Sequence, residues 1–113
     1  MEIHRLHEML LSAGIEHEWN DRGEQMIPPH ERKALKERRF WENIDFGWQV
    51  RIYKPDGELL ISAIEGYGTY GVTADRIEIM GLLTPEERES DSVCGWLTAE
   101  DVFYRIKKAV GKD

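Results

Sequence analysis

The sequence predicts an α+β domain in which a small antiparallel sheet, built on a central β-hairpin, is packed by N-terminal and C-terminal helices. Three patterns support this class. Apolar residues recur at helical spacing near both ends of the chain, two alternating runs fill its middle, and a KPDG turn at 54–57 separates those runs. A chain of 113 residues has the size of one domain, so we expect residues 1–113 to fold as a single unit.

The N-terminal segment is expected to form a helix from about Glu2 to Ala13. Its apolar stripe consists of Ile3, Leu6, Leu10 and Ala13. Gly14 follows as a natural stop, because glycine readily adopts the left-handed conformation that ends helices. Residues 15–19 then alternate between apolar and polar, with Ile15, His17 and Trp19 on one side. This alternation predicts a short, half-buried or edge strand.

Residues 21–46 are expected to be an insertion that carries a basic helix. Gly23 and the Pro28-Pro29 pair break the preceding pattern, and the stretch from His30 to Asn43 contains no Gly or Pro. Its cations are Arg32, Lys33, Lys36, Arg38 and Arg39. With Phe40 and Trp41 behind them they could bind phosphate and stack a base. We favour a surface helix that folds back onto the body, because the whole chain has a net charge of -7.

The central hairpin is the clearest element of the sequence. Trp48, Val50 and Ile52 share the inner face of the first strand, which runs over 47–53. The turn at 54–57 places Pro at its first corner and Gly at its last. In the returning strand, residues 58–64, apolar side chains occupy both faces, so we expect cover on both sides.

Further elements are expected after the glycine- and tyrosine-rich loop at 65–71. Thr73 is predicted to cap a helix that runs through Arg76, Ile77 and Met80 and ends at Gly81. A stronger signal for a helix start follows at Thr84, which is expected to cap a short acidic helix that ends by Asp91. Pro85 occupies the first helical position, and Glu87 lies three residues after Thr84, as in a capping box. A last short strand is predicted within 92–97.

The final helix is predicted to begin after Thr98, with Asp101 in the box position, and to stop at Gly111. Its expected buried stripe consists of Val102, Phe103, Ile106 and Val110. Basic residues in its last turns favour the negative end of the helix dipole.

Composition narrows the class of protein. The chain has 15 basic and 22 acidic residues and a single Cys. An acidic surface argues against direct nucleic-acid binding and against anionic membranes. One Cys cannot form an internal disulfide, which suits a reducing compartment, and no run of eighteen apolar residues is present. We therefore expect a soluble, cytoplasmic protein.

For several polar clusters, a purely structural role is favoured over a catalytic, metal-binding or mimicry role. His4, His7 and Glu8 do not follow the spacing of known zinc helices, so we expect solvated side chains and no metal. Cys94 has no candidate general base nearby in the sequence that could activate it as a nucleophile, so it is expected to pack as a small apolar residue. The acidic run comprises Glu86, Glu87, Glu89 and Asp91. It is interpreted as a solvated helix face, with mimicry of a nucleic acid as the alternative.

The loop from Gly66 to Gly71 is the segment most suited to binding. Gly66, Gly68 and Gly71 allow close approach of backbone N–H groups, and Tyr67 and Tyr70 offer flat faces. These glycines have the spacing of the dinucleotide-binding pattern G-x-G-x-x-G. That pattern requires a strand within a parallel βαβ unit, whereas the preceding strand here belongs to an antiparallel hairpin. A tight turn that packs over the sheet edge is the favoured interpretation, and a binding loop is the alternative.

Four segments together carry a resemblance: GWQVRIYKPDG, AIEGYGTYG, DRIEIMGLLTPEE and DSVCGWLTAEDVFYRI. They resemble a group of small uncharacterised accessory proteins of bacteriophages, prophages and other mobile elements of Gram-positive gut bacteria. The resemblance covers about residues 1–20 and 47–110, and the segment 22–46 is longer than in that group. It implies a bacterial cytoplasm and a role such as inhibition of host defence, and it implies no catalytic residue.

The sequence therefore predicts a non-enzymatic binding protein that needs no cofactor. The expected contact residues are Trp48, Arg51, Tyr67, Tyr70 and Arg76, because aromatic rings anchor by area and arginines pair with carboxylate or phosphate. The partner is expected to be a host protein or a small nucleotide, the latter held in a pocket shared by a homo-oligomer.

Two other classes stay open at this point. A small hydrolase would use Glu65 or Asp75 together with His17, provided that these groups converge within hydrogen-bond reach. A structural or regulatory subunit would expose a large apolar patch and have no pocket.

Overall fold

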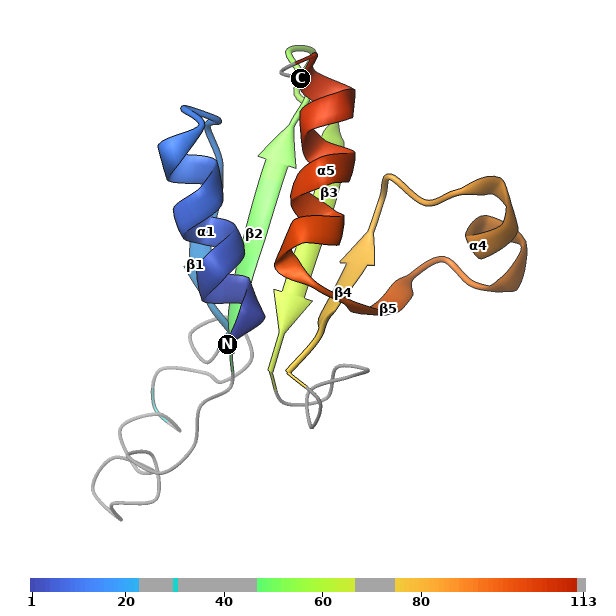
Figure 1. Cartoon of the computed structure of the whole chain (residues 1–113), viewed down its shortest axis with the longest axis horizontal. Helices are drawn as coiled ribbons and strands as arrows, with labels where there is room; N and C mark the ends of the chain where they lie inside the picture. Colours follow the sequence, from blue (N-terminus) through green and yellow to red (C-terminus); the bar gives the residue numbers. More distant parts are fainter. Residues whose placement is uncertain (23–29, 31–46, 67–74, 112–113) are drawn as a thin grey trace.

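The antiparallel sheet has five strands whose order in space follows their order in the sequence (Figure 1). The computed structural model describes residues 1–22, 30, 47–66 and 75–111. The predicted basic helix, nearly all of the predicted insertion at 21–46, and both loop tyrosines lie outside these residues. The α+β class predicted from the sequence is confirmed.

The central hairpin consists of β2 (Trp48–Tyr53) and β3 (Leu59–Glu65). Val50 pairs with Ala63 and Ile52 with Ile61, and the register shifts after Ile52. The predicted turn forms, since the Gly57 backbone N–H donates to the carbonyl of Lys54 at 2.9 Å. β1 (Glu18–Asp21) lies beside β2, so the predicted strand at 15–19 begins three residues later than expected.

Two further strands extend the sheet on the other side of the hairpin. β4 (Ile77–Met80) pairs with β3, and β5 (Cys94–Leu97) forms the edge beside β4. The helix predicted from Thr73 through Met80 is therefore wrong where it covers 77–80. Ile77 and Ile79 are fully buried on the core face, whereas Glu78 and Met80 lie on the opposite face of the sheet, and this two-residue period is that of a strand.

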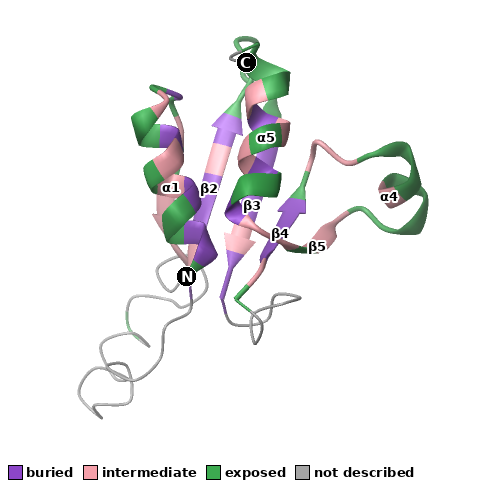
Figure 2. Ribbon diagram, viewed as in Figure 1, coloured by how far each residue is buried: buried purple, intermediate pink, exposed green. Residues whose placement is uncertain are grey.

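Both terminal helices cover the same face of the sheet. α1 (Glu2–Ser12) and α5 (Ala99–Val110) lie side by side, and their buried residues face the strands (Figure 2). Thr98 and Asp101 form the predicted capping box, and Gly111 ends α5 with a φ of 74°. Val110 was expected in the buried stripe, but its side chain is 39% exposed, because it lies in the last turn of the helix.

The core lies between these helices and the inner face of the sheet. Its fully buried members are Ile3, Leu6, Leu10, Val50, Ile61, Ala63, Ile77, Ile79, Ala99, Val102 and Ile106. α4 (Pro85–Ser90) stands apart from this core, has no buried residue, and carries the predicted capping box of Thr84 and Glu87 (Figures 1 and 2). The described segment around α4 therefore forms an arm beside the helical layer.

Candidate functional site

Trp48 belongs to a stack of rings between α1 and the first two strands. Trp19 lies parallel to Trp48, with 4.7 Å between ring centroids, and His7 stacks on Trp19 at 4.2 Å. The ring of His4 meets the edges of both indoles. The sheet register explains the contact, because Trp19 pairs with Val50, and Trp48 lies two residues from Val50 on the same face of β2. Trp48 is therefore occupied by partners within the chain.

Two histidines form a hydrogen-bonded pair at the edge of this stack. Nδ1 of His7 lies 2.7 Å from Nε2 of His17, and Nδ1 of His17 lies 2.9 Å from the carbonyl oxygen of Ile15. A carbonyl only accepts, so Nδ1 of His17 carries a proton and its Nε2 accepts from His7 in the neutral pair. Burial, reinforced by the neighbouring His17, lowers the pKa of His7.

The carboxyl groups of Glu65 and Asp75 meet where β3 ends and where the chain returns toward β4. They share a hydrogen bond. Oε1 of Glu65 accepts from the Ile3 backbone N–H at 2.9 Å, and Oδ1 of Asp75 accepts from the Glu2 N–H at 2.8 Å. Burial raises the pKa of Glu65 to about 7, whereas the hydrogen bond from Glu65 lowers the pKa of Asp75. Glu65 is thus the partner that holds the proton.

The same network continues to the start of α5. Oε2 of Glu2 accepts a hydrogen bond from the Ala99 backbone N–H at 2.6 Å. Its other oxygen, Oε1, accepts from Nη1 of Arg5 at 2.8 Å. Arg5 also pairs with Glu100. Carboxylates at these positions satisfy the free N–H groups of two helix N-termini and favour the positive ends of their dipoles. These carboxyl groups are therefore committed to holding the helices in place.

The arrangement that the alternative hydrolase interpretation requires does not form. Glu65 and Asp75 are brought together, but His17 uses both ring nitrogens on His7 and Ile15. A general base must lie within hydrogen-bond reach of the group that it serves. His17 makes no such contact with either carboxyl group.

Of the two predicted arginines, Arg51 lies on the opposite face of the sheet from Trp48. Arg51 pairs with Ser62 in the sheet and, by strand alternation, faces away from the helices, whereas Trp48 faces them. Within the described residues, the buried Nε of Arg51 has no hydrogen-bond partner. Arg76, half-buried, donates to the Asp75 carbonyl at 3.0 Å. Tyr67 and Tyr70 lie outside the described residues.

Glu87 and Arg105 connect α4 to α5 through a two-pronged ion pair. The guanidinium reaches the two carboxylate oxygens at 2.7 and 2.8 Å and also donates to the Leu82 carbonyl at 3.0 Å. This pairing lowers the pKa of Glu87 to about 2. Glu87 is thus removed from the predicted solvated run, and its neighbours Glu86 and Glu89 are exposed.

Cys94 lies on the same ion pair. Its Sγ contacts Oε2 of Glu87 at 3.2 Å, and burial together with that carboxylate raises the pKa of the thiol. A nucleophilic cysteine needs a lowered pKa and a positive environment. The geometry agrees with the packing role predicted for Cys94.

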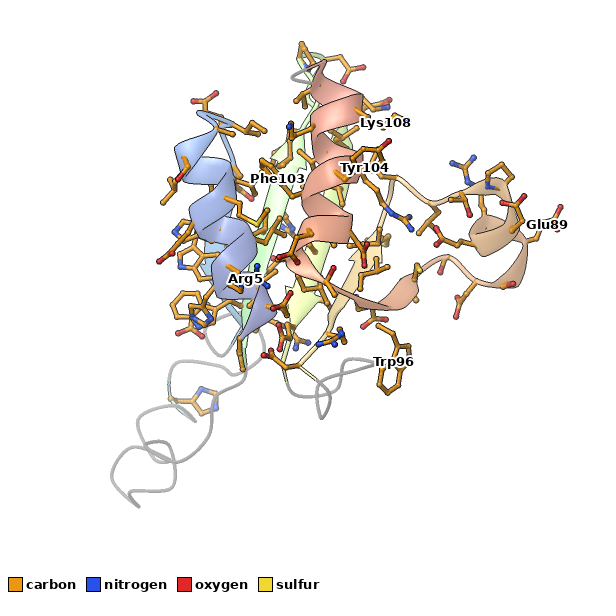
Figure 3. All side chains as sticks on the ribbon, in the orientation of Figure 1. Arg5, Glu89, Trp96, Phe103, Tyr104 and Lys108 are labelled. Carbon is orange, nitrogen blue, oxygen red and sulfur yellow. The ribbon has the colours of Figure 1, made fainter. Side chains whose placement is uncertain are left out.

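An open groove runs beside α5, between the helix and the arm that carries α4. Its volume is about 1030 Å³. The apolar lining consists of Leu59, Leu60, Leu82, Leu83, Leu97 and Tyr104. Figure 3 shows Tyr104 and Lys108 on the side of α5 that faces the arm, whereas Phe103 points toward α1. Tyr104 is 62% exposed and Leu59 is 38% exposed. We call this concavity the α5 groove.

Positive charge surrounds the apolar part of the α5 groove. Lys54, Arg88 and Lys108 line it together with the paired Arg105. Within the described chain, the guanidinium of Arg88 has neither a hydrogen bond nor an ion pair, and Nζ of Lys108 lies 5.2 Å from the centre of the Tyr104 ring. Its acidic lining residues have partners elsewhere: Asp101 accepts from Thr98 and Glu100 pairs with Arg5. The groove is a locally cationic site on an acidic protein.

Sequence reasoning did not find the α5 groove. Its walls come from segments 54–60, 82–88 and 97–109, which are distant in the sequence. The available signal was the pair of Leu-Leu dipeptides at 59–60 and 82–83, each with a cation five residues away, at Lys54 and Arg88.

Comparisons with family models, with curated proteins and with solved structures find no match to this chain. Among the described residues, no group of three or more His, Cys, Asp or Glu side chains is placed to hold a metal ion. Within the same residues, every helix is too short or too polar to cross a bilayer.

Proposed function

We propose that this protein is a non-enzymatic binding protein that holds a segment of a partner protein in the α5 groove. The groove carries the proposal, because half-buried leucines, together with the exposed Leu59 and Tyr104 and a rim of cations, form the kind of concave, mixed surface that binds other molecules. Anchoring by buried aromatic and leucine side chains, with charged groups at the rim, is typical of protein interfaces.

The chemistry of the other candidates supports binding over catalysis. The thiol of Cys94 is stabilised in its protonated form, and the ring nitrogens of His17 are both engaged. The Glu65 carboxyl is buried beneath the first turn of α1. Each of these groups holds the fold together.

The resemblance to phage and prophage accessory proteins makes the proposed partner a host protein of the bacterial cytoplasm. In this proposal the protein inhibits a host-defence factor by occupying one of its segments. The acidic run of α4 would remain outside this contact, since Glu87 is held by Arg105.

Site-specific photo-crosslinking in Gram-positive host cells tests this function. Benzoylphenylalanine replaces Leu59 or Tyr104 in the groove, and Leu11 on α1 serves as the control because its side chain is also exposed, at 60%. We expect one discrete adduct from both groove positions and none from Leu11. Identical adducts from all three positions, or no adduct from the groove, would refute the proposal.

A nucleotide is the second candidate for the same groove. The exposed Tyr104 ring provides a stacking face, with Lys108 beside it and Arg88 across the groove, and a volume of about 1030 Å³ accommodates a nucleotide. Calorimetric titration with cyclic and linear nucleotides would then give saturable heat that Tyr104→Ala abolishes. A silent titration removes this candidate.

A further inference from the structure

We infer that the segment held in the α5 groove is an acidic amphipathic helix of a partner protein. This inference rests on the proposed function and adds the chemistry of the occupant. Three features of the groove lead to it: the shape of its wall, the spacing of its apolar contacts, and the sign of its rim.

One wall of the groove is the helix α5. Asp101, Tyr104, Arg105 and Lys108 project into it at spacings of three and four residues, so they form one face of α5. The lining part of α5 from 100 to 109 measures about 14 Å at 1.5 Å per residue, which is about two and a half helical turns. A partner helix that lies alongside would bring its own apolar residues at i, i+3 or i+4, and i+7 against the leucines, as in helix-in-groove recognition.

The cations that line the groove indicate the charge of the partner segment. Arg88 has no partner within the described chain, and Lys54 makes only a long, exposed contact with Glu58 at 3.5 Å. Carboxylates on the flank of a docked helix would pair with Arg88 and Lys108, while its apolar side covers the leucines. The whole chain has a net charge of -7, so a groove rimmed by cations is where an acidic segment would be attracted to this protein.

The same charge argues against an occupant from this chain's basic stretch. Residues 30–39 carry five cations and would be repelled by Lys54, Arg88 and Lys108. A second copy of the protein is a distinct alternative, and its signature would be self-association in the absence of any added peptide.

Three labelled 14-residue helical peptides test the inference by fluorescence anisotropy. They share leucines at four positions and carry Glu, Gln or Lys at the flanking positions. We expect the Glu peptide to bind at least tenfold more tightly than the Gln peptide, and the Lys peptide not to bind. Rising salt from 50 to 300 mM should remove most of this difference, because exposed ion pairs are screened.

Two variants of neighbouring residues on α5 provide the matched comparison. Lys108→Glu changes a groove cation, whereas Lys107→Glu makes the same change beside Phe103, outside the groove. We expect Lys108→Glu and Arg88→Glu each to weaken the Glu peptide at least fivefold, and Lys107→Glu to weaken it less than twofold. Circular dichroism establishes that each variant is folded.

The outcomes separate this inference from the proposed function. Crosslinking from Leu59 and Tyr104 combined with equal affinity for the Glu and Gln peptides would overturn the acidic partner and leave the binding function intact. Tight binding of the Glu peptide without any crosslinked partner would support the groove chemistry and refute the cellular function. Concentration-dependent dimerisation in sedimentation, lost in Tyr104→Ala, would assign the groove to a second copy and overturn the inference.

Discussion

Replacing Glu65 by Gln should make the protein more stable at pH 8 and leave its stability at pH 4.5 nearly unchanged. Glu65 is 1% exposed, accepts a hydrogen bond from Ile3, and shares a proton with Asp75. A glutamine amide offers the same groups as a protonated carboxyl, because its C=O can accept from Ile3 and its N–H can donate to Asp75. Gln is therefore a permanent copy of the protonated state.

The magnitude follows from the pKa of Glu65, which rises from 4.5 to about 7 on folding. Between these values the folded protein binds more protons than the unfolded chain, so the free energy of unfolding falls as the pH rises. The contribution of Glu65 is complete below pH 4.5 and is lost as the pH passes through 7. At about 1.4 kcal/mol per pH unit, the loss over these 2.5 pH units is at most about 3.5 kcal/mol. Glu87, with a pKa of about 2, acts only at lower pH.

Urea denaturation at pH 4.5, 6, 7 and 8, followed by circular dichroism at constant ionic strength, measures this effect. Glu58→Gln is the control, since it removes the same charge from a side chain that is 72% exposed. The difference between Glu65→Gln and the parent should grow with pH, whereas the difference for Glu58→Gln should stay nearly constant. A Glu65→Gln protein with the parent's pH dependence, or one less stable than the parent at pH 8, would refute the reasoning.

Three further predictions concern other parts of the fold. Gly47→Ala should prevent folding or lower the free energy of unfolding by more than about 3 kcal/mol in urea denaturation, because φ is +93° and a Cβ would lie 1.9 Å from a backbone carbonyl oxygen of β3. Gly57→Ala is the control, since φ is also positive, at +92°, but the space around it is open, and it should cost only about 1 kcal/mol. Arg105→Lys should lose the two-pronged contact with Glu87, cost about 1–2 kcal/mol, and remove hydrogen-exchange protection from α4; unchanged protection would contradict this. The pKa of His7 is lowered, so the stability that its neutral form contributes above pH 6.5 is lost as the pH falls. Acidification to pH 5 should therefore change the tryptophan emission, because His7 stacks on Trp19. The same change in a His7→Phe variant would show that protonation of His7 is not its cause.

The hairpin and the terminal helices were predictable because their signals are local. Amphipathic spacing, a capping box and a turn such as KPDG are all contained within a few residues. Thr98 with Asp101 and Thr84 with Glu87 form as the sequence indicates. These elements define the class of fold before any long-range contact is known.

The strand β4 shows where local signals conflict. Gly81 was interpreted as a helix stop, but a Cβ at Gly81 would lie 2.4 Å from the carbonyl oxygen of Leu60. This glycine therefore permits the close approach of the end of β4 to β3, which is a tertiary requirement. The alternating, β-branched Ile77 and Ile79 carried the correct signal, and the short length of the run allowed both interpretations.

The candidate sites depended on contacts that the sequence does not contain. Glu65 and Asp75 were named as alternative partners of His17, but both carboxyl groups contact the first turn of α1, and His17 contacts His7. The α5 groove needs the relative placement of three distant segments. Without the strand register and the packing angle of α5, neither could be derived from residue patterns.

The first turn of α1 depends on residues that are synthesised much later. Its backbone N–H groups are satisfied by Glu65 and Asp75, which lie 62 and 73 positions away, and Glu2 in turn completes the start of α5 over 97 positions. A helix of 11 residues is marginal by itself in water. During translation, the first turn of α1 therefore lacks its acceptors until Asp75 has been synthesised, and α5 can join the same network only afterwards, through Glu2.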